Sequence, residues 1–284
     1  LRVRSDKRIL KSRLLSPIAR AVSGVILALS GAQLGYAASA SDATVVYGDT
    51  SFATPSENNL QVLQNSTKTV INWTKFGIRA NELVQYVQPS ANAVALNRIT
   101  GSDPSVILGQ LTANGQVFFL NQNGVVFGKD AQVNVGGLVA STLDMTNEDF
   151  ISGNYNFNLN GGTGTVLNYG ELNASGYVAL LGKQVSNQGT ITAKSVALAS
   201  GSQVSLSFQG EDLIDVTVDQ SVLDALVENK GAIIADNGQV ILTAKAADGL
   251  LRSVVNNEGV IEAKGITAKG GKILLEGDYV ANSG

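Results

Sequence analysis

The chain has 284 residues, of which 44% are hydrophobic, 15% are charged and 31 are glycine. This composition supplies enough apolar material for a packed core, so disorder is not expected for most of the chain. Cysteine and histidine are both absent. Their absence excludes disulfides, cysteine nucleophiles, Ser-His-Asp triads, and zinc or haem sites that depend on those residue types.

The first forty residues differ in composition from the rest. Seven basic residues and one acidic residue, Asp6, come before an apolar stretch at Ala21–Ala32, and small residues follow. This order predicts a secretory signal peptide over residues 1–40, cleaved after Ala37, Ala38 or Ala40. A transmembrane anchor is the alternative, but the apolar run is shorter than the roughly 20 residues that span a bilayer.

Removal of this segment changes the charge of the protein. The 20 basic and 23 acidic residues of the whole chain become 13 and 22, which is a net charge of about −9. An acidic surface repels phosphate backbones, so the sequence argues against a nucleic-acid partner.

Short strands and tight turns are predicted along residues 41–145. Alternating or apolar runs at 69–78, 83–90, 93–99 and 106–111 are typical of strands. Two Asn-Gly pairs, Asn114-Gly115 and Asn123-Gly124, lie on either side of an apolar run at 117–120. Turns this close together indicate short strands that stack closely.

A pattern, Val-x-Asn-x-Gly-x-(Ile/Leu)-x-Ala, recurs four times in the second half. Its asparagines are 19, 42 and 28 residues apart, so the unit is about 20 residues, which is typical of a solenoid. Each copy alternates like a strand, and its Asn and Gly tolerate the left-handed backbone of turns. The Asn and Gly positions are Asn168, Gly170, Asn187, Gly189, Asn229, Gly231, Asn257 and Gly259.

Stacking of these units predicts an all-β protein with a parallel β-helix. Each strand would pair with the rungs above and below it, and the repeated asparagines would form a buried amide ladder. Residues 41–284 would then make one elongated domain of about 12 rungs and about 60 Å. Hairpin turns in an antiparallel sandwich are the alternative, which four matching copies disfavour. The uncapped end at Asn282–Gly284 suggests a truncated chain.

Two further segments carry weaker signals. Glu211, Asp212, Asp215 and Asp219 form an acidic cluster that suits a solvated loop, or, as a minor alternative, a calcium site or an acid/base pair acting on polysaccharides. Ser221–Leu226 has the pattern of a capping box and predicts one helical turn beside the rungs.

Several motifs occur together in the N-terminal half and identify a family. They are Asn72-Trp73-x-x-Phe76, Gln88-Pro89-Ser90, Leu96-Asn97-Arg98-Ile99-Thr100-Gly101, Asn121-x-Asn123-Gly124 and Gly136–Asp144. In this order they resemble the N-terminal secretion domain of two-partner secretion exoproteins, the filamentous haemagglutinin-like proteins, and are nearest to the high-molecular-weight adhesin branch. The family usually has Asn-Pro-Asn-Gly where this chain has Gln122 in place of proline.

The resemblance implies a fold, a route and a partner. Family members are right-handed parallel β-helices with an N-terminal cap. They enter the periplasm behind a signal peptide and pass unfolded through an outer-membrane β-barrel transporter, whose periplasmic domains recognise the secretion domain. A chain without disulfides suits that passage. The protein is therefore expected at the surface of a Gram-negative-type bacterium or in the medium, with no cofactor and no enzymatic activity.

Candidate residues for transporter recognition are Asn121, Gln122, Asn123, Gly124, Asn97 and Arg98. A structural turn at 121–124 is an equal alternative, and Arg98 could instead cap a rung locally. The favoured function is an adhesin-like exoprotein whose domain directs export and nucleates β-helix folding outside the cell. A stand-alone carbohydrate- or surface-binding module is the alternative, a polysaccharide-active enzyme is a third, and a host-cell ligand would be bound by downstream regions.

Overall fold

A computed structural model describes residues 40–209, 213–235, 238–246, 254–263 and 271–284. The predicted signal peptide, apart from Ala40, and the candidate acidic residues Glu211 and Asp212 lie outside the described residues. No helix in the described ranges is long and apolar enough to cross a membrane.

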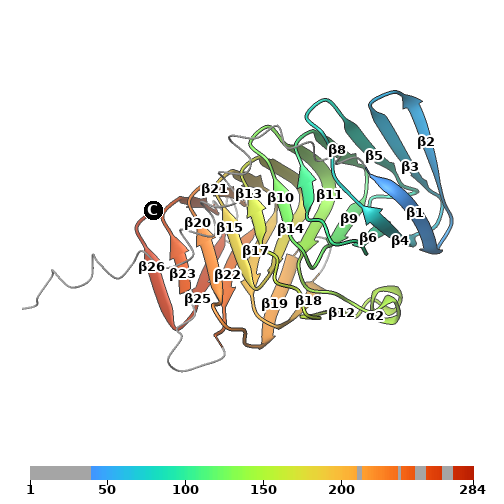
Figure 1. The fold of residues 1–284 in the computed structure, drawn as a ribbon. Coiled ribbons are helices and arrows are strands. Elements are labelled where there is room, and N and C mark those ends of the chain that lie inside the picture. Colours follow the sequence, from blue (N-terminus) through green and yellow to red (C-terminus); the bar gives the residue numbers. More distant parts are fainter. Residues whose placement is uncertain (1–39, 210–212, 236–237, 247–253, 264–270) are drawn as a thin grey trace, which may run out of the picture. The chain divides into compact units, whose positions relative to one another are not determined.

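The chain winds through three strands per turn, so that successive turns stack as parallel strands on three faces (Figure 1). Face 1 consists of β4 (Lys68–Lys75), β6 (Val94–Ile99), β9 (Gln116–Leu120), the second halves of β11 (Gln132–Ser141) and β14 (Glu171–Gly182), β17 (Ser195–Ser200), β22 (Gln239–Ala244) and β25 (Lys272–Glu276).

The other two faces follow the same rule. Face 2 consists of β3 (Asn59–Gln64), β5 (Leu83–Val87), β8 (Gln110–Ala113), the first halves of β11 and β14, β16 (Thr190–Thr192), β21 (Ala232–Ile234) and β24 (Val260–Glu262). Face 3 consists of β7 (Ser105–Ile107), β10 (Val125–Phe127), β13 (Val166–Asn168), β15 (Gln184–Asn187), β20 (Leu226–Asn229), β23 (Val254–Asn257) and β26 (Tyr279–Asn282). The predicted parallel β-helix is confirmed.

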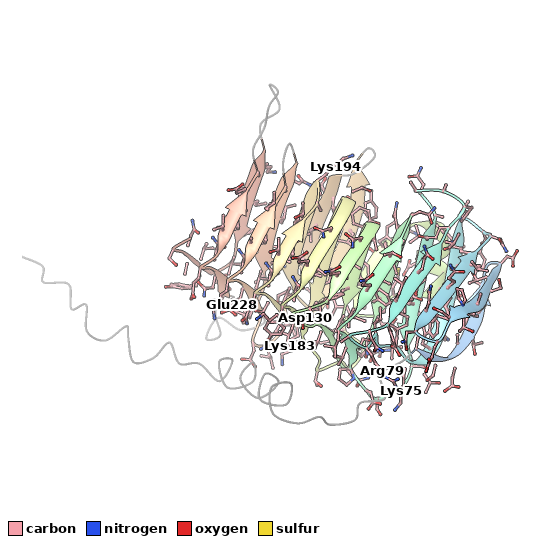
Figure 2. All side chains as sticks on the ribbon, turned by 90° about the horizontal axis from the view of Figure 1, so that it is seen from above. Lys75, Arg79, Asp130, Lys183, Lys194 and Glu228 are labelled. Atoms are coloured by element: carbon pink, nitrogen blue, oxygen red, sulfur yellow. The ribbon has the colours of Figure 1, made fainter. Side chains whose placement is uncertain are left out.

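Every second residue of a strand points into the space between the faces, and these residues form the core. In face 2, for example, Leu172 is paired with Val133 on one side and Ile191 on the other, and all three side chains are fully buried. Apolar residues thus stack on apolar residues from rung to rung, which removes their surface from water. The charged side chains labelled in Figure 2 project from the outside of the rungs.

An antiparallel cap closes the N-terminal end of the β-helix. β1 (Ser41–Tyr47) pairs antiparallel with β4, and β2 (Thr50–Ser56) pairs antiparallel with β3. Phe52 of the cap meets the ring of Trp73 edge-on, with ring centroids 5.5 Å apart, and Trp73 in turn meets Phe76 at 5.2 Å. The predicted cap is therefore present, and its strands cover the free edges of the first rung.

A second layer covers part of the outer side of face 1. It contains the helix α2 (Asn147–Ser152) and a three-stranded antiparallel sheet. The strands of that sheet are β12 (Tyr155–Asn158), β18 (Gln203–Gln209) and β19 (Leu213–Gln220). Between this layer and face 1 lies a second apolar core, which includes Leu96, Phe118, Phe150 and Phe157. Face 1 is therefore buried on both sides where the layer lies over it.

The only helix in the described residues is not where the sequence predicts one. Leu223 and Asp224 form a turn, in which Asp224 has a φ of 57°, and Leu226 already begins β20. The predicted helical turn there is wrong. The helix lies at α2 instead, where Thr146 caps its first turn and Gly153 ends it with a φ of 81°.

Candidate functional site

The repeated asparagines form a ladder inside the β-helix, as the sequence predicts. Each Nδ2 donates to the Oδ1 of the asparagine in the next rung. The donor–acceptor distances are 2.8 Å from Asn168 to Asn187, 2.8 Å from Asn187 to Asn229 and 2.7 Å from Asn229 to Asn257. Asn257 donates in the same way to Asn282, at 2.8 Å. Val280-x-Asn282-x-Gly284 is thus the start of another copy. It is not among the four copies predicted from the sequence, although its Val, Asn and Gly match the pattern.

The glycines of the repeat are required for a different reason from the predicted one. None of Gly170, Gly189, Gly231 and Gly259 has a positive φ. A Cβ on Gly189, Gly231 or Gly259 would instead lie 2.0–2.1 Å from the carbonyl oxygen of the glycine in the preceding rung. Close approach of stacked backbones therefore excludes every side chain at these positions. The Asn-Gly repeat thus has a structural role in the β-helix.

The turn at Asn121–Gly124 joins face 1 to face 3. The Gly124 N–H donates to the Asn121 carbonyl at 3.1 Å, and the Asn123 N–H donates to the Asn121 Oδ1 at 2.9 Å. Gly124 has a φ of 127°, a backbone conformation that favours glycine. Asn121 is fully buried, and its Nδ2 donates to the Asp103 carbonyl and to Ser105 Oγ, both at 3.0 Å. Asn121 builds the turn from inside, whereas Asn123 is exposed.

Neighbouring loops fix this turn from both sides. Asn123 Nδ2 donates to the Gly101 carbonyl of the preceding rung at 2.9 Å, and the Gly164 N–H of the following rung donates to the Gln122 carbonyl at 3.0 Å. A Cβ on Gly164 would lie 2.3 Å from the Gly124 nitrogen, so the two turns are in direct backbone contact. The edge formed by the half-buried Gln122 and the exposed Asn123 is accordingly held in one geometry.

The two candidates on β6 differ in position. Asn97 is fully buried, and its Oδ1 accepts from Trp73 Nε1 at 2.9 Å and from the Tyr86 hydroxyl at 2.8 Å. It satisfies core polar groups and has no surface that a partner could touch in the folded domain. Burial raises the pKa of Tyr86 well above its usual range, although the hydrogen bond to Asn97 acts in the opposite direction.

Arg98 lies on the outer side of β6 and is fully engaged. Its Nε donates to Asp144 Oδ1 at 3.0 Å, its Nη1 donates to Asn147 Oδ1 at 2.7 Å, and its Nη2 donates to the Met145 carbonyl. The side chain is 16% exposed. Arg98 therefore ties the segment before α2 to face 1, which agrees with the local role that the sequence left open.

Of the six candidates, Arg98, Gln122 and Asn123 meet at one polar corner of the molecule, which we call the corner site, whereas Asn97, Asn121 and Gly124 do not line it. Its hollow of about 410 Å³ is lined by Arg98, Ile99, Thr100, Gly101, Ser102, Leu120, Gln122, Asn123 and Asp144. A second hollow of about 480 Å³ shares Arg98 and Asp144 and continues along the start of α2. The corner site thus offers amide, hydroxyl and backbone groups at the surface, set around one ion pair.

Of the four acidic candidates, the structure describes Asp215 and Asp219. Asp219 accepts a hydrogen bond from Ser205 on β18, and its residue is exposed. In the described ranges no three acidic side chains are close enough together to hold a metal ion.

Comparison with known proteins shows the family to which the chain belongs. A model of the TPS secretion domain matches residues 37–284. The chain belongs to the TPS secretion domain family. The confirmed resemblance accounts for the order of motifs at residues 72–144, and the family is a secretion domain of exoproteins, not an enzyme family.

The relatives of this TPS domain are longer proteins. Two heme/hemopexin-binding proteins of Haemophilus influenzae are 37% and 33% identical to it over 84% and 83% of the chain. The chain spans only 27% and 28% of their length. Among solved structures, the HMW1 secretion domain from Haemophilus influenzae superposes with a TM-score of 0.70 and 29% identity, over 83% of this chain and 69% of that one.

Sequence reasoning did not find every residue that shapes the corner site. Ser102 and Asp144 line it, and Lys68 holds the far end of α2, as described below. Asp144 is the last residue of the family motif at Gly136–Asp144, so the sequence contained a signal that could have identified it. No local sequence pattern could have identified Lys68, because its partners lie 82 and 83 residues further along the chain.

Proposed function

We propose that this TPS domain directs export of its exoprotein through an outer-membrane β-barrel transporter, whose periplasmic domains bind the corner site. The observation that carries the proposal is the edge formed by the half-buried Gln122 and the exposed Asn123, which is fixed by hydrogen bonds to both neighbouring rungs. A preformed polar edge binds with little loss of conformational entropy. The exoprotein would then reach the cell surface or the medium by way of the periplasm.

Export with and without the transporter tests the route, and a blocking variant tests the site. Ser102 is exposed at the corner site, so Ser102→Trp fills the hollow without removing a hydrogen bond that builds the turn. Gln132→Trp on the outer side of face 2 introduces the same side chain elsewhere and is the matched control. We expect Ser102→Trp to reduce the exoprotein in the medium, and Gln132→Trp to leave it unchanged. Export without the transporter would contradict the route, and equal export of both variants would contradict the site.

Nucleation of the β-helix is part of the same proposal. Each rung offers the next one a row of backbone groups and an apolar layer, so rungs that have already folded template those that follow. The continuous ladder from Asn168 to Asn282 supports this templating, because each amide is satisfied only when the next rung is in register. The corner site precedes these rungs in the chain, so it would already be folded when the periplasmic domains bind it. The rungs from Asn168 onward would fold outside the membrane and help to draw the chain outward.

A second candidate function is binding of an uncharged carbohydrate along face 2. Its outer side carries an uncharged polar row, which consists of Gln61, Gln85, Thr112, Asn134, Asn173 and Thr192. Gln61 Nε2 donates to Gln85 Oε1 at 2.8 Å, and a hollow of about 470 Å³ beside Asn134 and Asn173 is lined mainly by small and polar residues. Binding to a panel of neutral polysaccharides, lost in Asn134→Trp, would support it. No binding to any of them would contradict it.

The names of the relatives mention heme, but we place no haem site on this chain. It contains no histidine and no cysteine, which are the usual protein ligands of haem iron.

A further inference from the structure

Lys68 makes a long-range contact that the export route alone does not explain. It is the first residue of β4, and its Nζ donates to the carbonyls of Phe150 at 2.8 Å and Ile151 at 2.9 Å. These carbonyls lie at the C-terminal end of α2, where helix carbonyls lack partners within the helix and carry partial negative charge. Beside Gly153, which ends the helix, Lys68 therefore adds a side-chain cap to the C-terminal end of α2, supplied by the first parallel strand of face 1.

The aromatic rings around Lys68 complete the contact. Its Nζ lies 5.5 Å from the centroid of the Phe150 ring and 5.8 Å from that of Tyr155. Burial among these groups lowers the pKa of Lys68 from its usual value, so placing an ammonium here has a cost. A fully buried Phe150 already anchors the helix to the second core. Phe150 therefore attaches the helix to the core, and Lys68 mainly sets the orientation of the helix.

The other end of α2 is tied by Arg98. Its guanidinium bonds to Asp144, Met145 and Asn147, and Thr146 Oγ1 accepts from the Asp149 N–H at 3.0 Å. Lys68 of β4 and Arg98 of β6, two cations on neighbouring strands of face 1, therefore hold the two ends of one short segment. This arrangement fixes α2 relative to face 1 in both position and direction.

The segment so held forms a wall of the corner site. Asp144 lines the first hollow, and Met145, Thr146, Asn147 and Glu148 line the second, together with residues 158–160. Glu148 is exposed on the outer side of α2. Arg98 and Asp144 of this wall pair with each other, so Glu148 adds a negative charge to it, and the partner face that meets Glu148 is expected to bring positive charge or hydrogen-bond donors.

We propose that α2 is part of the surface that the transporter's periplasmic domains bind, and that Lys68 is a positioning residue for this surface. Lys68 lines neither hollow of the corner site, so it acts only through the helix that it caps. The inference rests on the proposed function and adds to it a second binding element and the residue that orients it.

The test measures binding of the purified chain to immobilised periplasmic domains of its transporter, together with hydrogen exchange of residues 147–152. Lys68→Met removes this side-chain cap and Lys68→Arg retains a donor. Lys129→Met is the matched control, because Lys129 is exposed and follows β10 on face 3, whereas α2 covers face 1. We expect Lys68→Met to speed exchange in α2 and to raise Kd by about five- to tenfold, within the range that a coupled position usually changes. Lys68→Arg should recover most of the affinity, and Lys129→Met should match the parent chain.

The outcomes separate this inference from the proposed function. Faster exchange in α2 with an unchanged Kd for Lys68→Met would overturn the inference, while weaker binding of Ser102→Trp would leave the proposed function standing. Unchanged exchange in α2 would overturn the role of Lys68. Full affinity in both Lys68→Met and Ser102→Trp would overturn both proposals. If Lys68→Met does not fold, Glu148→Lys takes its place: reduced binding supports α2 as part of the surface, and unchanged binding contradicts it.

Discussion

At the scale of single residues, the asparagine ladder shows how a buried polar group can specify register. Each ladder amide in the middle of the stack both donates to and accepts from another amide, so a shift of one rung by one residue would leave several buried groups without partners. The sequence predicts this ladder because the spacing of the asparagines follows the rungs. It does not predict why the glycines are needed, since backbone approach between rungs is a property of the stack.

Removal of one internal amide should therefore cost more than removal of the last one. Asn229 is fully buried between Asn187 and Asn257, so Asn229→Ala leaves two buried amides with unsatisfied groups. We expect the free energy of unfolding to fall by about 2–6 kcal/mol, at about 1–3 kcal/mol for each unsatisfied group. Asn282→Ala, at an exposed position, is the control and should cost less than about 1 kcal/mol. Equal urea midpoints for the two variants would show that the ladder contributes nothing.

The departure of this chain from its family at Gln122 gives a second prediction. Gln122 occupies the second position of a turn closed by the Gly124 N–H and the Asn121 carbonyl, where proline is favoured. In the described ranges the Gln122 N–H donates to no group, so proline would remove no hydrogen bond. We expect Gln122→Pro to raise the free energy of unfolding by about 0.4–1 kcal/mol, because it restricts the unfolded chain. A lower urea midpoint would show that the backbone at Gln122 does not suit proline.

At the scale of elements, strand positions could be predicted but the second layer could not. Alternation locates most strands, and the resemblance to the family implies an N-terminal cap. In face 1, however, runs such as Val178–Leu181 are buried on both sides. A continuous apolar run indicates that both sides of a strand are covered, but it does not identify the segment that covers the outer side. The covering strands β18 and β19 alternate polar and apolar residues, which indicates strands, but alternation does not show which sheet a strand packs against. The side-chain cap at the C-terminal end of α2 comes from Lys68, far away in the sequence, and no local pattern could reveal it.

The second layer should be less stable than the β-helix it covers. Phe157 is fully buried in the second core and lies on β12, which pairs with β18 but not with the rungs. We expect Phe157→Ala to cost about 3–5 kcal/mol of local stability, through lost contacts and the cavity that remains. Hydrogen exchange should then quicken in β12 and β18, while β15 and β20 of face 3 keep their protection. Uniform loss of protection would mean that the layer and the β-helix unfold as one unit.

At the scale of the whole molecule, the buried tyrosines predict how stability depends on pH. Burial raises the pKa of Tyr86 and Tyr177 well above 10.0, the latter with a smaller repulsive contribution from Tyr155. Below the unfolded pKa both states hold the proton, so stability is unaffected. Above it only the unfolded state ionises, and the free energy of unfolding falls by about 1.4 kcal/mol per pH unit for each tyrosine.

Urea unfolding between about pH 9 and pH 11 measures this slope, because the unfolded tyrosine pKa of about 10 lies within that range. Tyr86→Phe should make the slope shallower by the contribution of one tyrosine, although it also removes the hydrogen bond to Asn97 at neutral pH. An identical slope in Tyr86→Phe and the parent chain would contradict the assignment to Tyr86.

Stacking of the rungs also connects stability to export. Leu180 is fully buried on β14, between Ala140 and Leu198 of the adjacent rungs, so Leu180→Asp places an unpaired carboxylate in the core. Such a change costs more than about 4 kcal/mol and interrupts the stack at the middle of the chain. If folding outside the membrane draws the chain outward, the rate of its appearance in the medium should fall. Thr192→Asp, which adds the same charge at an exposed position on β16, should leave the rate unchanged. Equal rates for the two variants, with the unfolding of Leu180→Asp verified, would show that folding supplies none of the driving force for export.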